Sequence, residues 1–258
     1  MPIAERSETT ARCPICGTEF VYDTSQPTRE LKICPSCGAN GRSCAIIHLV
    51  CWSLLCNQAS LCEQIQRKDL RVIGLSDGPV YSGRLKETFD YTNTFYHKEP
   101  LLDIRDPCPH WIETADLVIA SEVFEHVIGP SQAAFDGAYR LLKPNGFLLL
   151  TVPYINHGNS LEHYPGLVRY ESKKDTLGRW VAELVFEDGQ KATDHKPRFH
   201  GGPGSTLELR LFNRERLLRE LHTAGFVDIE TFDEDKPELG INWGKPSRPI
   251  LAKKPATP

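Results

Sequence analysis

The sequence predicts an α/β fold, in which helices cover both faces of a mostly parallel sheet that follows a small metal-binding module. From Arg71 onward, short apolar strands alternate with helical segments. Two of these strands, 115–121 and 147–154, are apolar almost throughout, as in sheets that are buried on both faces. Before Arg71 the chain carries two CPxCG turns, which have the spacing of metal ligands.

The composition is that of an ordinary globular protein. The 258 residues are 40% hydrophobic and 25% charged, with a formal net charge of −4, which gives no general attraction to nucleic acid or to an anionic membrane. The first residues lack the apolar segment of a signal peptide, and the longest apolar run, 45–56, is too short to span a bilayer. We therefore expect a cytoplasmic protein with no membrane partner.

Four of the nine cysteines lie in the two turns: Cys13 and Cys16 in the first, Cys34 and Cys37 in the second. Seventeen residues separate Cys16 from Cys34. In each turn the two-residue gap lets both sulfurs face one point, and four thiolates at one point suit tetrahedral Zn²⁺. Because the protein would fill all four coordination positions, we expect this zinc to be structural.

A nucleic-acid-binding ribbon is the alternative for this module. Residues 12–45 carry four basic and three acidic side chains, and their aromatic residues are only Phe20 and Tyr22. There is neither a basic stripe nor a stacking platform. A folding clip, or a cap on the substrate side, is the favoured interpretation.

Residues 40–67 predict a helix, because apolar side chains recur there at helical spacing. This stretch contains four further cysteines: Cys44, Cys51, Cys56 and Cys62. We interpret them as small apolar core residues, and a second metal site that includes His48 is the alternative. We expect a ribbon over 1–45, a linking helix over 46–70 and a larger domain over 71–258.

The larger domain alternates strand and helix. Asn213 can cap a last helix and Gly225 can end it. The predicted elements are strand 71–76, helix 82–89, strand 90–97, a very short strand 99–104, strand 115–121, helix 131–146, strand 147–154, and an antiparallel final strand at 248–254.

The segment ADLVIASEVFEHV (115–127), followed by a helix that ends in LLKPNG (141–146), resembles the second half of class I S-adenosylmethionine-dependent methyltransferases of the type 11 group. The resemblance covers 71–154 and returns at 213–234. With the CPxCG pair, the whole chain resembles bacterial members that carry a zinc ribbon. It implies a Rossmann-like class I methyltransferase sheet, parallel with an antiparallel last strand, behind a small zinc ribbon.

The resemblance also implies where S-adenosyl-L-methionine would bind. The family's first strand ends in an acidic residue and is followed by glycines; here Gly74 takes the acidic position, and only Gly78 of the glycines is present. The methionine end would lie over Ser76, Asp77 and Gly78, with Asp77 receiving the ammonium group in place of the missing acid.

The remaining cofactor contacts follow from the next strand ends. Glu99 is the nearest candidate for the ribose hydroxyls, Asp103 would accept from the adenine amine, and Ile104 would pack on the ring. Ser121 and Glu122 would line the methyl-transfer side. Asp103 as a solvated turn residue and Glu122 as a helix N-terminal charge are the alternatives.

Two neighbouring residues, Glu125 and His126, are interpreted as structural, holding the following helix against the sheet. An insert at about 155–212, with a hairpin signal at Asp188-Gly189, would cover the acceptor pocket.

Five of the nine histidines lie in or after this insert, and an acceptor hydroxyl would need a base of near-neutral pKa. His163 and His200 are the candidates for that role, and a surface or hydrogen-bonding role is the alternative for each.

The sequence thus predicts a methyltransferase that acts on a small-molecule or sugar-like acceptor and contains a structural Zn²⁺. One alternative is a nucleic-acid or protein methyltransferase that docks through its ribbon, against which the missing basic stripe counts. Another is a non-catalytic protein that keeps the fold as a binding module. The reduced glycine loop favours this last alternative, and the adenine-side segment opposes it.

Overall fold

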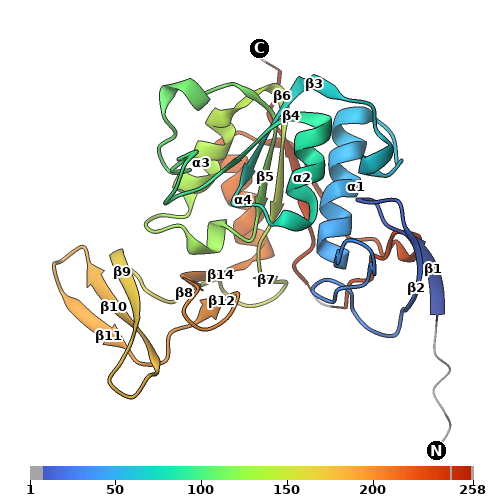
Figure 1. The fold of residues 1–258 in the computed structure, drawn as a ribbon. Coiled ribbons are helices and arrows are strands. Elements are labelled where there is room, and N and C mark those ends of the chain that lie inside the picture. Colours follow the sequence, from blue (N-terminus) through green and yellow to red (C-terminus); the bar gives the residue numbers. More distant parts are fainter. Residues whose placement is uncertain (1–7, 245, 257–258) are drawn as a thin grey trace, which may run out of the picture.

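The computed structural model describes residues 8–244 and 246–256, which are built around a six-stranded sheet in the order β15-β16-β6-β5-β3-β4 (Figure 1). The four strands β6, β5, β3 and β4 pair in parallel, and β16 is antiparallel to both of its neighbours. The predicted fold class is confirmed. The strands are β3 (Arg67–Leu75), β4 (Phe89–Thr94), β5 (Ala115–Ser121), β6 (Leu142–Thr151), β15 (Val227–Thr231) and β16 (Ile250–Lys253).

Helices cover both faces of this sheet, with α1 and α2 on one side and α3 and α4 on the other (Figure 1). The strands are apolar on both faces for this reason: Leu117 and Ile119 of β5 pack toward α1, whereas Val118 and Ala120 pack toward α3. The helices are α1 (Gly41–Leu55), α2 (Pro79–Thr88), α3 (Gln132–Leu141) and α4 (Arg214–Ala224).

Helix α1 is shorter than the predicted helix over 40–67. The Asn40 side chain caps its start by accepting from the Ser43 N–H at 2.8 Å, and Cys56 ends it in the left-handed conformation at φ 52°. A short 3₁₀ turn (Leu61–Glu63) leads into β3.

The additional cysteines of this region do not form a second metal cluster among the described residues. Cys44 and Cys51 are buried in the core, as the favoured interpretation expected, whereas Cys56 and Cys62 are exposed.

The predicted strand 99–104 does not form. A single parallel bridge between Phe95 and Leu101 takes its place, and the chain runs on as a loop along the sheet edge. Pro100 offers no N–H to a ladder, which explains why this apolar segment does not extend the sheet.

The N-terminal module is a hairpin of β1 (Glu8–Arg12) and β2 (Glu19–Asp23) that is joined to the C-terminal segment. The Thr28 hydroxyl donates to the Gly240 carbonyl at 2.9 Å, and the Tyr22 hydroxyl donates to the Pro237 carbonyl at 3.1 Å, beside the short turn η4 (Pro237–Leu239). Buried residues of the module continue into the core under α1 and α2. The division into a ribbon, a linking helix and a domain stays a prediction, but one core runs through all three.

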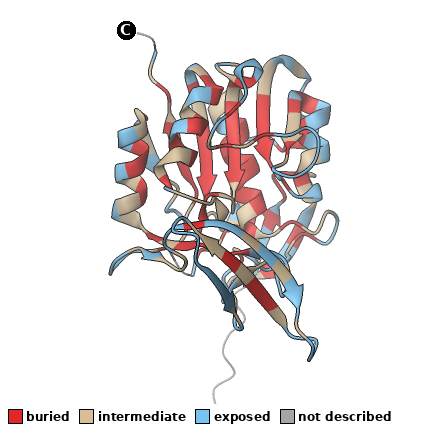
Figure 2. Ribbon diagram, turned by 90° about the vertical axis from the view of Figure 1, so that its left-hand side faces the viewer, coloured by how far each residue is buried: buried red, intermediate tan, exposed pale blue. Residues whose placement is uncertain are grey.

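The insert adds a separate antiparallel sheet of three strands, β9, β10 and β11, that extends from the carboxyl edge of the main sheet (Figures 1 and 2). The predicted hairpin is present, since Gly189 turns at φ 80° and its N–H donates to the Phe186 carbonyl. The strands that begin, form and end the insert are β7 (Tyr154–Ile155), β8 (Leu161–Glu162), β9 (Leu167–Lys174), β10 (Trp180–Phe186), β11 (Lys191–Asp194), β12 (Phe199–His200), β13 (Thr206–Leu207) and β14 (Arg210–Asn213).

The outer strands of this added sheet are largely exposed, and its small core is centred on Ala182, Leu184 and Leu207. In the part of the chain that the structure describes, no helix combines the length and the apolar character needed to cross a bilayer.

Candidate functional site

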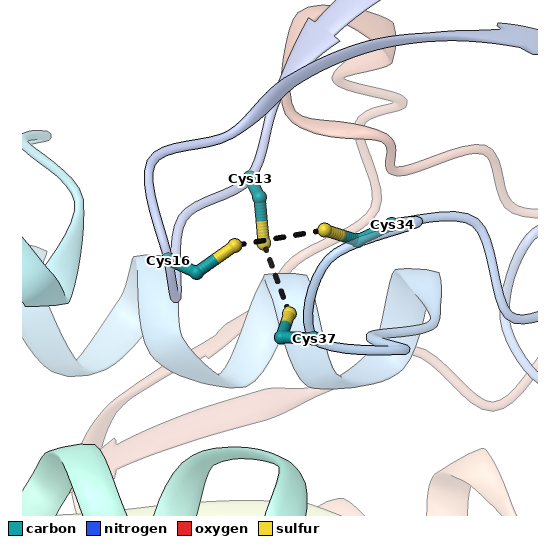
Figure 3. Close-up of side chains that lie close together, drawn as sticks. All are labelled: Cys13, Cys16, Cys34 and Cys37. Carbon is teal, nitrogen blue, oxygen red and sulfur yellow. Dashed lines mark hydrogen bonds between the residues drawn. The ribbon is translucent and has the colours of Figure 1, made fainter.

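The two CPxCG turns bring their four sulfurs together (Figure 3). Cys13 Sγ lies 3.6 Å from Cys37 Sγ, Cys16 Sγ lies 3.6 Å from Cys34 Sγ, and all four atoms are within 4.8 Å of one another. Bonds of about 2.3 Å to a tetrahedral Zn²⁺ place sulfurs about 3.8 Å apart, so these residues fit the ion. We call this group the four-cysteine site.

The sequence of each turn explains this geometry. Gly17 and Gly38 adopt φ 73° and 71°, a conformation that a side chain would strain, and their N–H groups donate back to the Cys13 and Cys34 carbonyls. Each turn therefore closes on itself and presents two sulfurs on one side.

A cavity of about 590 Å³ lies at the carboxyl ends of β3, β4 and β5, where a doubly wound sheet binds its ligands. Five of the predicted site residues line it: Ser76, Asp103, Ile104, Glu122 and His200. Other lining residues that the sequence did not single out for it are Arg42, Tyr96, His126, Tyr170 and Thr206.

On the predicted adenine side, Asp103 is held by Arg105. The guanidinium Nε donates to both Asp103 oxygens, at 2.9 and 3.1 Å, and the Arg105 backbone N–H donates to one of them. Partial burial opposes ionisation of Asp103, but these hydrogen bonds outweigh it and the pKa of the carboxyl falls below its usual range. The result is an ionised acceptor beside the buried Ile104.

Asp77 does not lie open to the cavity, contrary to the expectation that it receives an ammonium group. Its two oxygens accept from the Tyr81 and Tyr91 hydroxyls at 2.7 and 2.8 Å. Burial raises the pKa of Asp77 to about 6, although both hydrogen bonds act in the opposite direction. A Cβ added at Gly74 would meet Asp77 Oδ2 at 2.1 Å, so the carboxyl fills the space of a side chain at position 74.

Four other predicted residues lie outside the cavity wall. Gly78 precedes α2 as its N-cap, and a Cβ there would meet no atom within 4 Å. Glu99 sits on an exposed loop and accepts from the Leu101 N–H. The Ser121 hydroxyl accepts from Arg42 at 2.8 Å, and His163 is 3.1 Å from Glu208. Of the two histidines considered as a base, the structure brings only His200 to the cavity.

Arg29, which follows the ribbon's hairpin, reaches the loop after β5. Its Nη2 lies 2.8 Å from Glu122 Oε1, so a basic residue of the N-terminal module neutralises part of the charge at the cavity. Glu122 itself adopts φ 56°, which turns the chain at the end of β5. No sequence pattern indicated this pairing, because its partners are 93 residues apart.

Glu125 and His126 hold the insert rather than the following helix. The Leu209 N–H donates to the Glu125 carbonyl at 2.9 Å, and His126 Nδ1 lies 2.7 Å from the Leu207 carbonyl oxygen. His200, from β12, completes the cluster: its Nδ1 is 3.0 Å from Glu125 Oε1 and its Nε2 is 3.4 Å from Glu122 Oε2.

This cluster contains a carboxyl group that is strongly affected by burial. Glu125 has no exposed side-chain area, and burial raises its pKa. The adjacent Glu125, helped by Glu122, raises the pKa of His200 in turn. The sequence did contain a signal for this cluster: the segment EVFEH (122–126) places three titratable side chains within five residues directly after a buried strand.

Comparison with known families identifies the central part of the chain, since a family described as a methyltransferase domain matches residues 55–150. The prediction of a methyltransferase is thereby confirmed for this part of the chain. No curated protein matches.

Solved structures that resemble this one include an S-adenosylmethionine-dependent methyltransferase from Methanosarcina mazei, with 11% identity, a TM-score of 0.44, and coverage of 74% of this chain and 95% of that one. A sugar N-methyltransferase from Streptoalloteichus has 13% identity and a TM-score of 0.43, with 72% and 80% covered. The CMeT domain of the citrinin polyketide synthase has 15% identity and a TM-score of 0.41; 73% of this chain is covered, but only 47% of that one. The chain thus spans about half the length of the last structure.

Proposed function

We propose that this protein transfers a methyl group from S-adenosyl-L-methionine to a small-molecule or sugar-like acceptor, and that the four-cysteine site holds a structural Zn²⁺. The observation that carries the proposal is the cavity at the carboxyl edge of the sheet. Residues that follow β3, β4 and β5 line it together with residues of the insert, including Tyr170 and Thr206. Its volume of about 590 Å³ lies within the usual range for sites that enclose small ligands.

The residues present suit the cofactor at its adenosine end. Asp103 offers an ionised acceptor for the adenine amine, and Ile104 offers apolar surface for the ring. The cofactor supplies an already activated methyl group, so the chain's own residues have to bind, orient and exclude water.

At the methionine end, the structure favours a different carboxylate from the one that the sequence suggested. Asp77 is engaged by two tyrosines, whereas Glu122 lines the cavity and its Oε2 accepts no hydrogen bond among the described residues. We therefore assign the ammonium contact to Glu122. Arg42, which also pairs with Glu30, lines the same cavity, and we assign it to the methionine carboxylate.

The acceptor side is formed by the insert. Tyr170 and Thr206 offer hydroxyl groups to a polar acceptor, and His200 presents its ring to the same cavity. Of the two candidate histidines, we assign His200 to the acceptor side of the cavity, because His163 does not line it.

Calorimetry with S-adenosylhomocysteine tests this function on zinc-loaded protein. We expect binding in the micromolar range and a loss of about tenfold for Asp103→Asn, because one charged hydrogen-bond acceptor is removed. Asp106→Asn is the matched control, since that carboxyl lies on the same loop and is 88% exposed. It should bind as the parent does.

Two results would contradict the proposal. A folded, zinc-loaded protein that binds no S-adenosylhomocysteine would indicate a non-catalytic module. RNA binding that weakens steeply with salt would instead favour a nucleic-acid substrate docked through the ribbon.

A further inference from the structure

We propose that Glu125, His126 and His200 form a second metal site, which binds a divalent first-row transition-metal ion at the wall of the cavity. The three side chains come from two separate parts of the chain: the 3₁₀ turn η3 (Phe124–His126) after β5, and strand β12 of the insert. This site does not depend on the proposed function, because it follows from the arrangement of the side chains alone.

The three potential ligand atoms are spaced as ligands of one ion. Glu125 Oε1 lies 3.0 Å from His200 Nδ1 and 3.6 Å from His126 Nε2, and the two ring nitrogens are 3.2 Å apart. Bonds of about 2.1 Å place neighbouring ligand atoms about 3.0 Å apart around an octahedral ion and about 3.4 Å apart around a tetrahedral one. The observed triangle is close to both spacings.

His126 is oriented for coordination by its other nitrogen. Its Nδ1 lies 2.7 Å from the Leu207 carbonyl oxygen, which can only accept, so Nδ1 carries the proton and donates. In the neutral ring the lone pair is therefore on Nε2, which faces the cluster. A backbone carbonyl that fixes the ring in this way is the usual outer partner of a metal-bound histidine.

Glu125 supplies the second, independent observation. Its side chain is completely buried, and neither oxygen accepts a hydrogen bond of good geometry from a described residue. A buried carboxyl group that has two imidazoles beside it but no well-formed hydrogen bond is costly, and a cation at the cluster would compensate that cost. Two imidazoles and one carboxylate form a donor set that suits Zn²⁺, Fe²⁺ or Mn²⁺.

The position of the cluster leaves room for a further ligand. His126 and His200 both line the cavity, whereas Glu125 lies behind them. An ion held by these three residues would therefore expose its remaining coordination positions to the cavity. This is the opposite of the four-cysteine site, where the protein supplies every ligand. The additional ligand would be water or an oxygen atom of a bound acceptor.

Mn²⁺ titration of zinc-loaded protein, followed by electron paramagnetic resonance and calorimetry, tests this site. Mn²⁺ is the probe because it is paramagnetic, accepts a carboxylate ligand and leaves a thiolate site to Zn²⁺. We expect a single tight site in the parent, and at least about tenfold weaker binding in His200→Asn and Glu125→Gln. His163→Asn is the matched control, because that histidine also pairs with a glutamate but lies outside the cavity wall.

The absence of Mn²⁺ binding, or binding that His200→Asn leaves unchanged, would overturn the proposal and leave the cluster as an ion pair only. If Glu125→Gln does not fold, Mn²⁺ binding to His200→Asn tests the proposal instead. The His200 side chain is 30% exposed, so we expect its replacement to leave the fold intact. Binding of S-adenosylhomocysteine, measured separately on the same samples, distinguishes failure of the metal site from failure of the proposed function.

Discussion

The molecule contains two clusters of metal-ligating side chains that are built in different ways. In the four-cysteine site, each of two short turns supplies two sulfurs, and a glycine within the turn fixes the geometry. In the cluster of Glu125, His126 and His200, one ligand comes from a segment 74 residues away and is placed by the insert. The first cluster is therefore a local property of the chain, whereas the second exists only while the insert is docked.

The two segments that carry these clusters also differ in how they are attached to the main sheet. The module that carries the four-cysteine site shares a hydrophobic core with α1 and α2, so its stability and that of the main sheet are joined. The insert has a small core of its own and is attached to the main sheet by the buried Phe212 and by polar contacts, among them those of Arg210. This difference predicts that damage to the ribbon affects the whole fold, while damage to the insert's attachment affects the cavity first.

Removal of the zinc from the four-cysteine site should have the largest effect. We expect Cys34→Ser to lower the free energy of unfolding by more than about 3 kcal/mol, because structural Zn²⁺ contributes strongly to folding and this core continues into the domain. Denaturant unfolding measures this free energy, and metal analysis measures the zinc content of the variant. Cys62→Ser is the control, since that thiol is exposed and outside the cluster. Equal stability of the two variants would show that the ribbon is dispensable.

The attachment of the insert depends on Arg210, which is almost completely buried. Its guanidinium donates to the carbonyls of Phe124, Val127 and Gly129, at 2.7 to 3.0 Å, and pairs with Glu162.

We expect Arg210→Leu to cost about 3 kcal/mol, because it leaves three backbone carbonyls without their donor, whereas Glu162 keeps its ion pair with Arg216. It should also weaken Mn²⁺ binding, since the insert carries His200. The exposed Arg169→Leu should change neither quantity. Intact Mn²⁺ binding in Arg210→Leu would mean that the insert docks by other contacts.

The buried carboxyl of Asp77 predicts a smaller, pH-dependent effect. Its pKa is about 6 in the folded chain and about 4 in the unfolded chain. Between these values the folded state holds the proton more tightly, so this group adds stability as the pH falls from 7 to 5, by about 1 kcal/mol.

Asp77→Asn should remove this contribution from the difference in unfolding free energy between pH 7 and pH 5. The exposed Asp90→Asn should keep the difference of the parent protein. A pH dependence that is identical in Asp77→Asn and the parent would contradict the buried position of this group.

The smallest expected effect tests the contact between the ribbon side and the cavity. Arg29→Gln removes one partner of Glu122 but leaves another, His200, and should change the affinity for S-adenosylhomocysteine by a few-fold, roughly 0.5–1 kcal/mol for a partly buried pair. Arg219→Gln on the exposed side of α4 is the control. An unchanged affinity would show that the N-terminal module stabilises the fold without influencing the site.

Several parts of the fold followed from local patterns. The apolar strands at 115–121 and 147–154 predicted a sheet covered on both faces, and Asn213 and Gly225 limit α4 as expected. The helix over 40–67 was predicted too long, because Cys56 ends it in the left-handed conformation, which helical periodicity does not show. The predicted strand at 99–104 is reduced to one bridge, in which the Pro100 carbonyl accepts from Phe95, because Pro100 has no N–H to donate to a longer ladder.

The sequence by itself determined the four clustered cysteines, the alternation of strand and helix, and the methyltransferase class, because each depends on residues that are close together along the chain. Only the tertiary structure decided that Asp77 is buried under two tyrosines, that Arg29 reaches Glu122, and that His200 rather than His163 meets Glu125 and His126. Most of these contacts join residues far apart in the sequence. The docking of the insert and the packing of the ribbon fix them, and neither leaves a periodic or local signal.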